Sequence, residues 1–277
     1  MPESPEVQRI VDQFNDKYKG KILIDSEIHD FKWKTKKKLL DLMTNSVLDQ
    51  VSRKAKYIIF QFTSSIGTFY LTSHLSMSGS WINRLKSTLA PTHTRMSLRF
   101  ENGVIDFIDP RKWGRIEIYT QEDFFKNEKL QAKFSNYGLD ALTENITSEW
   151  LYQKIQLEKN KEIGIKPLLM DQNFIAGIGN IYASEICFLA GINPFKKIKN
   201  LTAENLQNLS ESISEVIKNA YTYGGSTIRT YKDTNGEKGK TVHMIYGQKI
   251  CRLCKSIVSK GPQNGRTTYW CNKCQPI

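Results

Sequence analysis

Four cysteines near the end of the chain constrain its folding more than any other feature. They form two Cys-x-x-Cys pairs, Cys251 with Cys254 and Cys271 with Cys274, and sixteen residues separate the pairs. Two such pairs at this separation are typical of four thiolates that bind one Zn²⁺ tetrahedrally. Because four thiolates leave no open position for a catalytic water, we expect one zinc ion with a structural role.

The residues between the two pairs predict a β-hairpin. Residues 267–270 favour a strand, and Gly261, Pro262, Asn264 and Gly265 favour the turn before it. The alternative to zinc, two disulfides, requires an oxidising compartment. The first six residues contain no basic and then apolar stretch of the kind that directs export, so the zinc interpretation is preferred.

The charge of the chain indicates a polyanionic partner. The sequence of 277 residues has 40 Lys and Arg against 28 Asp and Glu, a net charge of +12. From Arg229 to the end, ten Lys and Arg face two acidic residues, so a net +8 lies in this short segment. Such density attracts phosphate and makes binding to nucleic acid sensitive to salt. A merely soluble surface is the alternative, while a membrane partner is not expected because no apolar run is long enough to span a bilayer.

Hydrophobic periodicity changes along the chain. Apolar residues at helical spacing from Val7 to Tyr18 predict one helix, with Ser4 as its N-cap. Residues 21–119 contain short runs rich in β-branched and aromatic residues, which predict strands near 57–63, 67–73, 96–100, 104–108 and 115–119. Residues 121–223 return to helical spacing, with helices expected near 150–157, 166–172, 181–189 and 201–220. The lysine-rich residues 32–38 suggest a solvated loop or edge.

These changes of period predict an α+β fold. We expect an N-terminal helix with a β-sandwich, followed by a helical domain and a β-hairpin zinc finger. The predicted boundaries are 1–120 for the N-terminal catalytic domain, 121–142 for a linker, 143–244 for the helical domain and 245–277 for the finger.

The first residues carry a chemical possibility as well as a helix start. If Met1 is removed, Pro2 presents a secondary amine, and a free α-amino group has a pKa of about 8. A neutral amine can attack an aldehyde-like carbon and form an iminium, which permits elimination. Glu3 and Glu6 would stand beside it as proton donors or relays, although helix capping alone also explains an acidic first turn.

Seven motifs in order give this possibility its weight. Pro2-Glu3-x-Pro-Glu6 opens the chain and the cysteine pairs close it; the other five motifs are residues 53–57, 74–79, 109–114, 177–185 and 224–231. Together they resemble the formamidopyrimidine-DNA glycosylase and endonuclease VIII family over essentially the whole chain. The stretches 74–79, 109–114 and 224–231 are closer to the formamidopyrimidine branch.

The resemblance implies roles for four catalytic residues. Pro2 matches the nucleophile that attacks the sugar carbon C1′ while the damaged base leaves, and Glu3 matches the acid that acts on the opened sugar. Glu6 matches a supporting carboxylate, and Lys56 matches a lysine that contacts phosphate at the lesion.

The resemblance also implies a DNA-binding set. Asn180 lies where the family's helix-two-turn-helix motif holds a phosphate, and Arg266 matches the finger arginine that holds it from the other side. Lys166 is also predicted to bind DNA. Met77, Arg111 and Trp113 match the side chains that fill the gap left by the extruded nucleotide. Extrusion is required because a base inside a duplex cannot be reached, and wedge side chains offset part of its cost.

Some residues depart from the family's pattern. Ser4 replaces the leucine or glycine usual there, and Trp113 stands where purine-repair members usually carry phenylalanine. Gly177 and Gly179 beside Asn180 suggest backbone amides that approach a phosphate. The Gly- and Lys-rich residues 232–242 suggest a loop that covers an oxidised purine.

The resemblance predicts a bifunctional DNA glycosylase and abasic-site lyase for oxidised purines, which cuts the strand by successive eliminations. The expected partner is double-stranded DNA with oxidised bases or abasic sites, bound by a monomer in the cytoplasm at the nucleoid. An oxidised-pyrimidine glycosylase of the endonuclease VIII type remains an alternative within the family. A protein that binds damaged DNA without catalysis is the alternative from another class.

Overall fold

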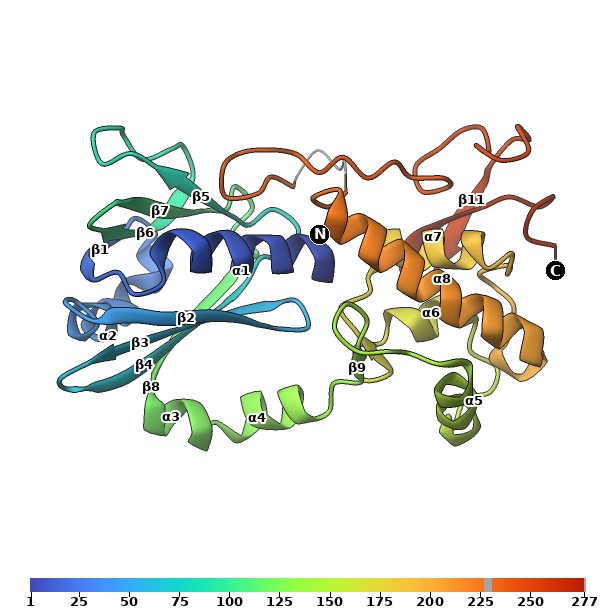
Figure 1. Cartoon of the computed structure of the whole chain (residues 1–277), viewed down its shortest axis with the longest axis horizontal. Helices are drawn as coiled ribbons and strands as arrows, with labels where there is room; N and C mark the ends of the chain where they lie inside the picture. The colour runs from blue at the N-terminus through green and yellow to red at the C-terminus, as the bar shows by residue number, and fades with distance from the viewer. Residues whose placement is uncertain (227–230, 277) are drawn as a thin grey trace. The chain divides into compact units, whose positions relative to one another are not determined.

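The structure is a computed structural model that describes residues 1–226 and 231–276, and Figure 1 shows its chain trace. The chain divides into two compact units. The sandwich unit contains Met1–Pro2, Glu6–Ser135 and, of the described residues, 231–240. The helical unit contains Glu3–Pro5, 136–226 and 241–276. The predicted four-part boundaries remain a prediction, but this division shows that each unit is built from separated stretches of sequence.

Two four-stranded antiparallel sheets form the sandwich unit, in the orders β1-β6-β7-β5 and β2-β3-β4-β8 (Figure 1). The strands are β1 (Leu23–Ile28), β2 (Val47–Lys54), β3 (Tyr57–Ser64), β4 (Gly67–His74), β5 (Ser80–Arg84), β6 (Thr94–Phe100), β7 (Gly103–Ile108) and β8 (Arg115–Thr120). The β3–β4 register pairs Tyr57 with His74 at one end of the sheet. The turns that connect the strands carry several of the predicted site residues.

The first helix and the two sheets share one core. Helix α1 (Ser4–Tyr18) contributes its apolar face, including Phe14, because Val7, Ile10, Val11, Phe14 and Tyr18 recur at helical spacing. The ring of Phe14 meets Trp81 of β5 edge-on at 6.0 Å between centroids. Trp81 is fully buried, and its indole N–H donates to Ser73 Oγ at 3.0 Å, so its polar atom is satisfied inside the core.

Helices and a short parallel pair of strands form most of the helical unit. They are β9 (Leu139–Asp140), α5 (Ser148–Leu157), α6 (Ile165–Met170), β10 (Ile175–Ala176), α7 (Asn180–Leu189), η2 (Ile198–Asn200) and α8 (Ala203–Thr222). Thr202 and Asn205 form a capping box at the start of α8, which satisfies backbone donors that the first turn leaves open. The hairpin of β11 (Ser259–Gln263) and β12 (Arg266–Trp270) completes the unit.

The predicted fold class and the clearest strands and helices are confirmed. The lysine-rich segment, however, is η1 (Phe31–Lys36) followed by α2 (Lys37–Leu42), because the buried Leu40 anchors a helical turn. Most of the expected linker is also helical, as α3 (Gln121–Lys126) and α4 (Glu128–Ser135). Ser4 does not act as a side-chain cap, because its buried hydroxyl has no hydrogen-bond partner.

The predicted hairpin turn is shorter than expected. Gly261 and Pro262 belong to β11, and only Asn264 and Gly265, with φ of 46° and 72°, form the turn. Two successive positive φ angles are typical of the two-residue turn that Asn-Gly favours. Among residues 1–226 and 231–276, no helix is both long and apolar enough to span a membrane.

Candidate nucleic-acid interface and metal centre

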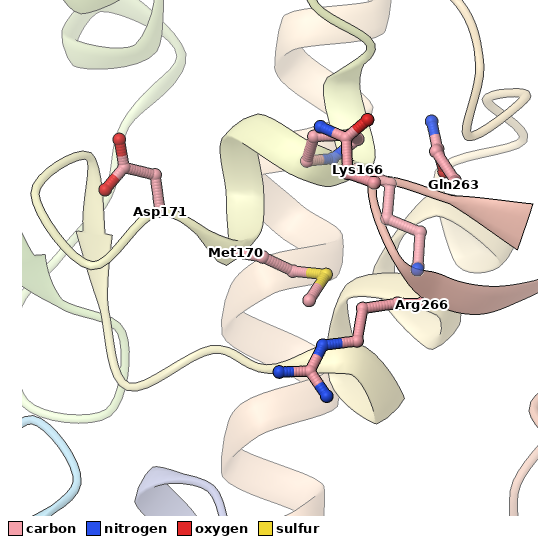
Figure 2. A pocket seen from close by; sticks show the side chains of 7 residues that line it. Lys166, Met170, Asp171, Gln263 and Arg266 are labelled. Carbon is pink, nitrogen blue, oxygen red and sulfur yellow. The ribbon is translucent and has the colours of Figure 1, made fainter.

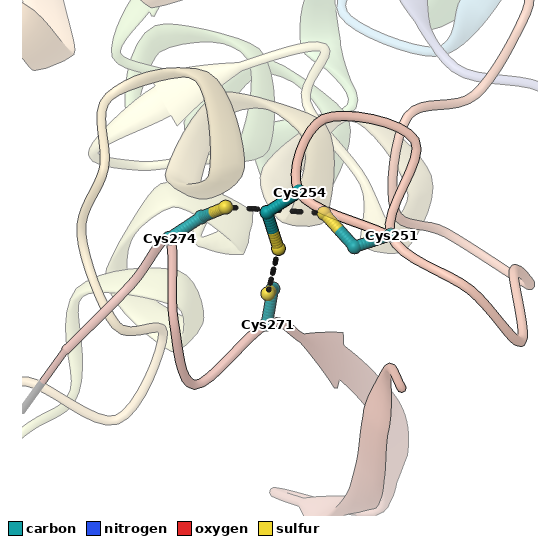
Figure 3. A group of neighbouring side chains, drawn as sticks. All are labelled: Cys251, Cys254, Cys271 and Cys274. Atoms are coloured by element: carbon teal, nitrogen blue, oxygen red, sulfur yellow. Dashed lines mark hydrogen bonds between the residues drawn. The ribbon is translucent and has the colours of Figure 1, made fainter. Parts of the chain in front are cut away.

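The four cysteines of the two pairs converge at the base of the hairpin (Figure 3). The four sulfur atoms all lie within 4.8 Å of one another. Cys251 Sγ is 3.9 Å from Cys274 Sγ, and Cys254 Sγ is 3.4 Å from Cys271 Sγ, so neither pair is covalently joined. Four thiolates at about 2.3 Å from a tetrahedral Zn²⁺ lie about 3.8 Å apart, and the observed spacing fits this geometry. The cluster can therefore bind one structural zinc ion.

Backbone hydrogen bonds shape the two turns that present the sulfurs. In the first turn, Lys255 has a φ of 62° and its N–H donates to Cys251 O at 3.0 Å. In the second, Gln275 N–H donates to Cys271 O at 2.8 Å, and the Gln275 side chain accepts from Cys271 N at 2.9 Å. Gln275 is fully buried, so it fixes the second turn from inside.

Glu3 occupies the N-terminus of α7. Its carboxylate accepts from the N–H groups of Gly179 at 2.5 Å, Ile181 at 2.9 Å and Tyr182 at 3.4 Å, and the residue is almost fully buried. The positive end of the helix favours an anion there. A Cβ atom on Gly179 would lie 2.5 Å from Glu3 Cδ, so a larger residue there would displace the Glu3 carboxylate.

This arrangement corrects the reason that the sequence suggested for the two glycines. The amides at the start of α7 bind Glu3 instead of a phosphate, and a Cβ atom on Gly177 would lie 2.6 Å from Ser4 Cβ. Ser4 N–H also donates to Gly177 O at 3.0 Å. The Gly-x-Gly segment is therefore built around the first residues of the chain.

Lys166 connects α6 with α7 and the hairpin. Its ammonium donates to Asn180 Oδ1 at 2.6 Å and to Thr268 Oγ1 at 2.9 Å, while Asn180 Nδ2 donates to Thr267 O at 3.1 Å. Lys166 is 1% exposed, and burial lowers the pKa of its ammonium to about 8. Lys166 therefore lies beneath the surface, where it holds Asn180 and the hairpin together.

A pocket of about 190 Å³ lies beside this network (Figure 2). Its lining residues are Lys166, Pro167, Met170, Asp171, Gln263, Asn264 and Arg266. Figure 2 shows the Lys166 side chain extending from α6 toward the hairpin, and the Arg266 side chain extending from the hairpin to below Met170. Arg266 is exposed, so its guanidinium can meet an anion from solvent.

In the sandwich unit, a rigid turn after β7 presents two of the predicted wedge residues. Asp109 is fully buried and accepts from the N–H groups of Arg111 at 3.3 Å and Gly114 at 2.6 Å. Within this turn Lys112 has a φ of 58°. The Arg111 guanidinium carbon lies 5.3 Å from the ring centroid of Trp113, a cation–π geometry. Trp113 is 52% exposed, which leaves a large aromatic face in solvent.

Met77, the third predicted wedge residue, is 37% exposed in the turn after β4. Gly79 N–H closes that turn by donating to Leu75 O at 2.9 Å, and a Cβ atom on Gly79 would lie 2.5 Å from the same oxygen. Ser78 Oγ donates to Asp109 Oδ1 at 2.5 Å, which ties this turn to the one that carries Arg111.

Positive charge gathers at the Lys56 end of the sandwich. Lys56 is 7% exposed in the turn between β2 and β3. The pKa of His74 is lowered to about 4, first by burial and then by the positive charges of Lys133, Lys56 and Arg115. This imidazole is therefore neutral at physiological pH. Lys133 Nζ also donates to Tyr57 OH at 2.7 Å. A cluster of cations that keeps a histidine neutral can attract a phosphate.

The remaining predicted residues lie at the chain start, and one further residue had no predicted role. Pro2 groups with the sandwich unit, and Glu6 is buried in the first turn of α1. In α7, Glu185 accepts from the N–H groups of Met244, Ile245 and Tyr246 at 2.7–3.0 Å, and burial raises its pKa. Its only sequence signal was a carboxylate on an otherwise apolar helix. Of motif 224–231, residues 227–230 lie outside the described part of the chain.

Two domains of one protein family match this chain, one in the sandwich unit and one mainly in the helical unit. The N-terminal domain of formamidopyrimidine-DNA glycosylase matches residues 1–116, and the H2TH domain of formamidopyrimidine-DNA glycosylase matches residues 137–232. The chain belongs to the formamidopyrimidine-DNA glycosylase family. The resemblance inferred from the seven motifs is thus confirmed, including its closeness to the formamidopyrimidine branch.

Two relatives and a solved structure illustrate the formamidopyrimidine-DNA glycosylase likeness. The chain is 34% identical over 285 residues to the formamidopyrimidine-DNA glycosylase of Wolbachia pipientis wMel, which covers 99% of this chain and 100% of the relative. It is 33% identical over 284 residues to that of Ureaplasma parvum serovar 3, with the same coverage. A structure of Lactococcus lactis Fpg in complex with DNA containing an abasic site has a TM-score of 0.87 at 28% identity, covering 99% and 100% of the two chains.

Proposed function

We propose that the protein is a bifunctional DNA glycosylase and abasic-site lyase of base excision repair. The observation that carries this proposal is the full-length similarity to a protein solved on abasic-site DNA, and in another complex on DNA containing Fapy-dG. Its substrates are oxidised purines, 8-oxoguanine and formamidopyrimidines, opposite cytosine. The exposed Arg111–Trp113 pair, the basic finger and the cations around His74 support a duplex partner.

Pro2 performs the first chemical step in this proposal. Its nitrogen attacks C1′ of an extruded nucleotide, the bond from C1′ to the base breaks, and the base leaves with the bonding electrons and a proton. Opening of the sugar gives an iminium, which acts as an electron sink while two eliminations expel the 3′ and 5′ phosphates. Glu3, a carboxylate oriented by three backbone N–H groups, takes up the proton that the Pro2 nitrogen releases and passes it to the sugar oxygen as the ring opens, and Glu6 supports it.

The other predicted residues bind and deform the duplex. Asn180 and Arg266 hold a phosphate in the helical unit, where Lys166 orients Asn180 from below. Lys56 supplies a second phosphate contact from the sandwich unit. Met77, Arg111 and Trp113 fill the space left by the extruded nucleotide, because their turns are fixed and their side chains are exposed.

The zinc ion, when bound, supplies no reaction step. It crosslinks the two turns of the finger and so fixes the hairpin that carries Arg266. We also propose that the protein acts as a monomer on nucleoid DNA, which sedimentation with and without a lesion duplex would test.

The decisive experiment is borohydride trapping on abasic DNA. A chain whose Met1 has been removed should form a covalent adduct with the duplex. A variant with one extra residue before Pro2 has an amide in place of the amine and should form none, although it still binds DNA. Absence of an adduct from a correctly processed chain would favour the alternative of a binding protein without catalysis.

A second experiment separates the two branches of the family. Cleavage of matched duplexes that contain 8-oxoguanine or thymine glycol should be faster on 8-oxoguanine. The reverse order would support an oxidised-pyrimidine glycosylase of the endonuclease VIII type.

A further inference from the structure

A β-bulge in β6 directs the side chain of Arg95 toward the turn that follows β7. The register between β6 and β7 shifts between Thr94 and Met96, so Arg95 is one extra residue in β6. A bulge bends its strand and changes the direction in which the side chain of the extra residue points. The Arg95 side chain is 12% exposed, so most of it lies within the sandwich unit.

The Arg95 guanidinium holds the backbone of Asp109, the residue that organises this turn. Arg95 Nε donates to Asp109 O at 2.9 Å. Asp109 N–H donates to His93 O at 3.1 Å, so both backbone polar groups of Asp109 are bound to the start of β6 and the residue before it. The carboxylate of Asp109 in turn accepts from Arg111 N and Gly114 N. Arg95 thus fixes the residue around which the whole turn is built.

Asp30 orients the guanidinium of Arg95. Asp30 lies between β1 and η1 and is 5% exposed, and its Oδ2 lies 3.4 Å from a terminal nitrogen of Arg95. Asp30 N–H also donates to Arg95 O at 3.3 Å, so backbone and side chain join the two residues. Because burial disfavours an unpaired charge, the carboxylate and the guanidinium stay together. The pair therefore restricts Arg95 to one orientation.

The same carboxylate contacts the turn a second time, through Lys112. Lys112 Nζ lies 3.4 Å from Asp30 Oδ2. Lys112 stands between the two wedge residues of this turn, and residues other than glycine rarely adopt its φ of 58°. The Lys112 side chain is 48% exposed, so its ion pair contributes less than that of Arg95. The turn is therefore held mainly at Asp109 and additionally at Lys112.

We propose that Arg95 is a positioning residue for the wedge formed by Arg111 and Trp113. It holds the turn 109–114 in the shape that enters the gap left by the extruded nucleotide, and it need not touch DNA. The inference rests on the proposed function and adds to it a residue of β6 that Asp30 orients. A turn that is already ordered offsets the cost of extrusion better than one that must be ordered during insertion. Loss of Arg95 should therefore slow extrusion and leave the later chemical steps unchanged.

The test compares two single-turnover rates, base excision from a duplex with 8-oxoguanine opposite cytosine and cleavage of single-stranded DNA with an abasic site. The single strand has no paired base to extrude, so its cleavage should not depend on the wedge. Arg95→Met should slow base excision by about tenfold, the effect expected from the loss of a buried charged hydrogen bond, and slow cleavage of the single strand by less than about twofold. Equal slowing of both reactions, or no slowing on the duplex, would overturn the inference.

A fluorescent base beside the lesion measures extrusion directly and needs no single strand as a reference. 2-Aminopurine next to 8-oxoguanine gains fluorescence when the stack opens, and stopped-flow mixing gives the rate of this gain. Arg95→Met should lower the rate of opening by about the same factor as the rate of base excision. An unchanged rate of opening would overturn the inference even if base excision were slower.

A double variant separates positioning from stability. Arg95→Met leaves the buried carboxylate of Asp30 with one cation fewer, which lowers the stability of the fold. Adding Asp30→Asn removes this charge and should raise the midpoint of urea denaturation again. Base excision should nevertheless stay slow, because Asp109 O still lacks its donor. Recovery of base excision together with stability would overturn the inference.

Arg84→Met is the matched control, because it removes a similar ion pair from the same sheet. The Arg84 side chain is 11% exposed, and its Nε donates to the fully buried Asp106 at 2.5 Å. Its loss should lower stability and leave the ratio of the two rates within about twofold of that of the unchanged protein. A change of the ratio as large as that for Arg95→Met would overturn the inference. If the unchanged protein acted on neither DNA, the proposed function itself would fail, which differs from a failure of this inference.

Discussion

Among the described residues, twenty-five buried apolar side chains form the core of the sandwich unit. The buried cluster at the finger, residues 245–276, has only four members from the finger itself, two of them cysteines, and these pack with Phe188 of α7. The sandwich core is rich in aromatic rings that contact one another, such as Phe14, Phe60 and Trp81. Such packing stabilises a unit through burial of apolar surface. The finger has too little apolar surface for this, so its stability depends on a metal ion that joins its two turns.

The largest expected effect is the loss of the finger when one thiolate is removed. Cys271→Ser should reduce bound zinc from one ion per chain to nearly none, because three thiolates and a hydroxyl bind Zn²⁺ weakly. The hairpin should lose its order and DNA cleavage should fall by about a hundredfold, while the sandwich keeps its thermal transition. Metal analysis and calorimetry test this, with Cys187→Ser as the control because Cys187 is buried outside the cluster. Normal DNA cleavage by metal-free protein would contradict the view that the finger depends on a metal ion while the sandwich depends on its apolar core.

The next effect is a loss of stability of the sandwich unit without a loss of zinc, the opposite of the effect expected for Cys271→Ser. Trp81→Ala should lower the free energy of unfolding by about 3–5 kcal/mol, since it removes a fully buried ring and leaves Ser73 Oγ without its donor. Zinc content should remain at one ion per chain. Urea denaturation and metal analysis would show both results, and loss of zinc with Trp81 would mean that the finger depends on the sandwich core.

A smaller effect is expected where a buried cation supports the finger. Lys166→Met should weaken binding to a lesion duplex by about tenfold, because Asn180 and Thr268 lose their common donor. Zinc content should not change. Lys196→Met is a matched control, since Lys196 is in the same unit and donates to Asn205 near the start of α8. Equal losses in both variants would indicate a general charge effect instead of positioning.

The smallest effect concerns pH. Burial lowers the pKa of Lys166 to about 8 in the folded chain, below its ordinary 10.5. Between these two values the unfolded chain binds more protons at this group than the folded chain does, so the contribution of Lys166 to stability rises with pH. The stability of the unchanged protein relative to Lys166→Met should therefore increase from about pH 8 to pH 10 in urea denaturation. A constant difference would show that this ammonium is well hydrated.

A large part of the fold and site could be predicted because the residues that determine these features lie close together in the sequence. The cysteine spacing led directly to the metal cluster, and short runs rich in β-branched and aromatic residues located the clearest strands. The lysine-rich segment misled because its charges conceal Leu40 and Met43, two buried residues that make it helical. The number of charged residues in this segment does not indicate that the helix also has a buried apolar face.

Contacts between distant residues could not be read in the same way. Lys166 was predicted to bind DNA, but nothing in its neighbourhood predicted its burial, because one of its two partners, Thr268, lies 102 residues further along the chain. The glycines before α7 suggested room for a phosphate. Only the fold shows that the Glu3 carboxylate occupies this position at the start of the helix. Gln13 carried no signal, because its partners Asp233 and Thr234 are 220 and 221 residues away.

Tyr231 has a practical consequence for anyone who wishes to dissect this chain. Its ring fills part of the sandwich core from a stretch that lies beyond the whole of α5 to α8 in sequence. A fragment that ends at Ser135 therefore lacks one of its own core side chains, together with the hydrogen bonds that join Asp233 and Thr234 to Gln13. A recombinant sandwich should instead graft residues 231–240 onto that fragment through a flexible spacer, and its solubility should exceed that of the simple truncation.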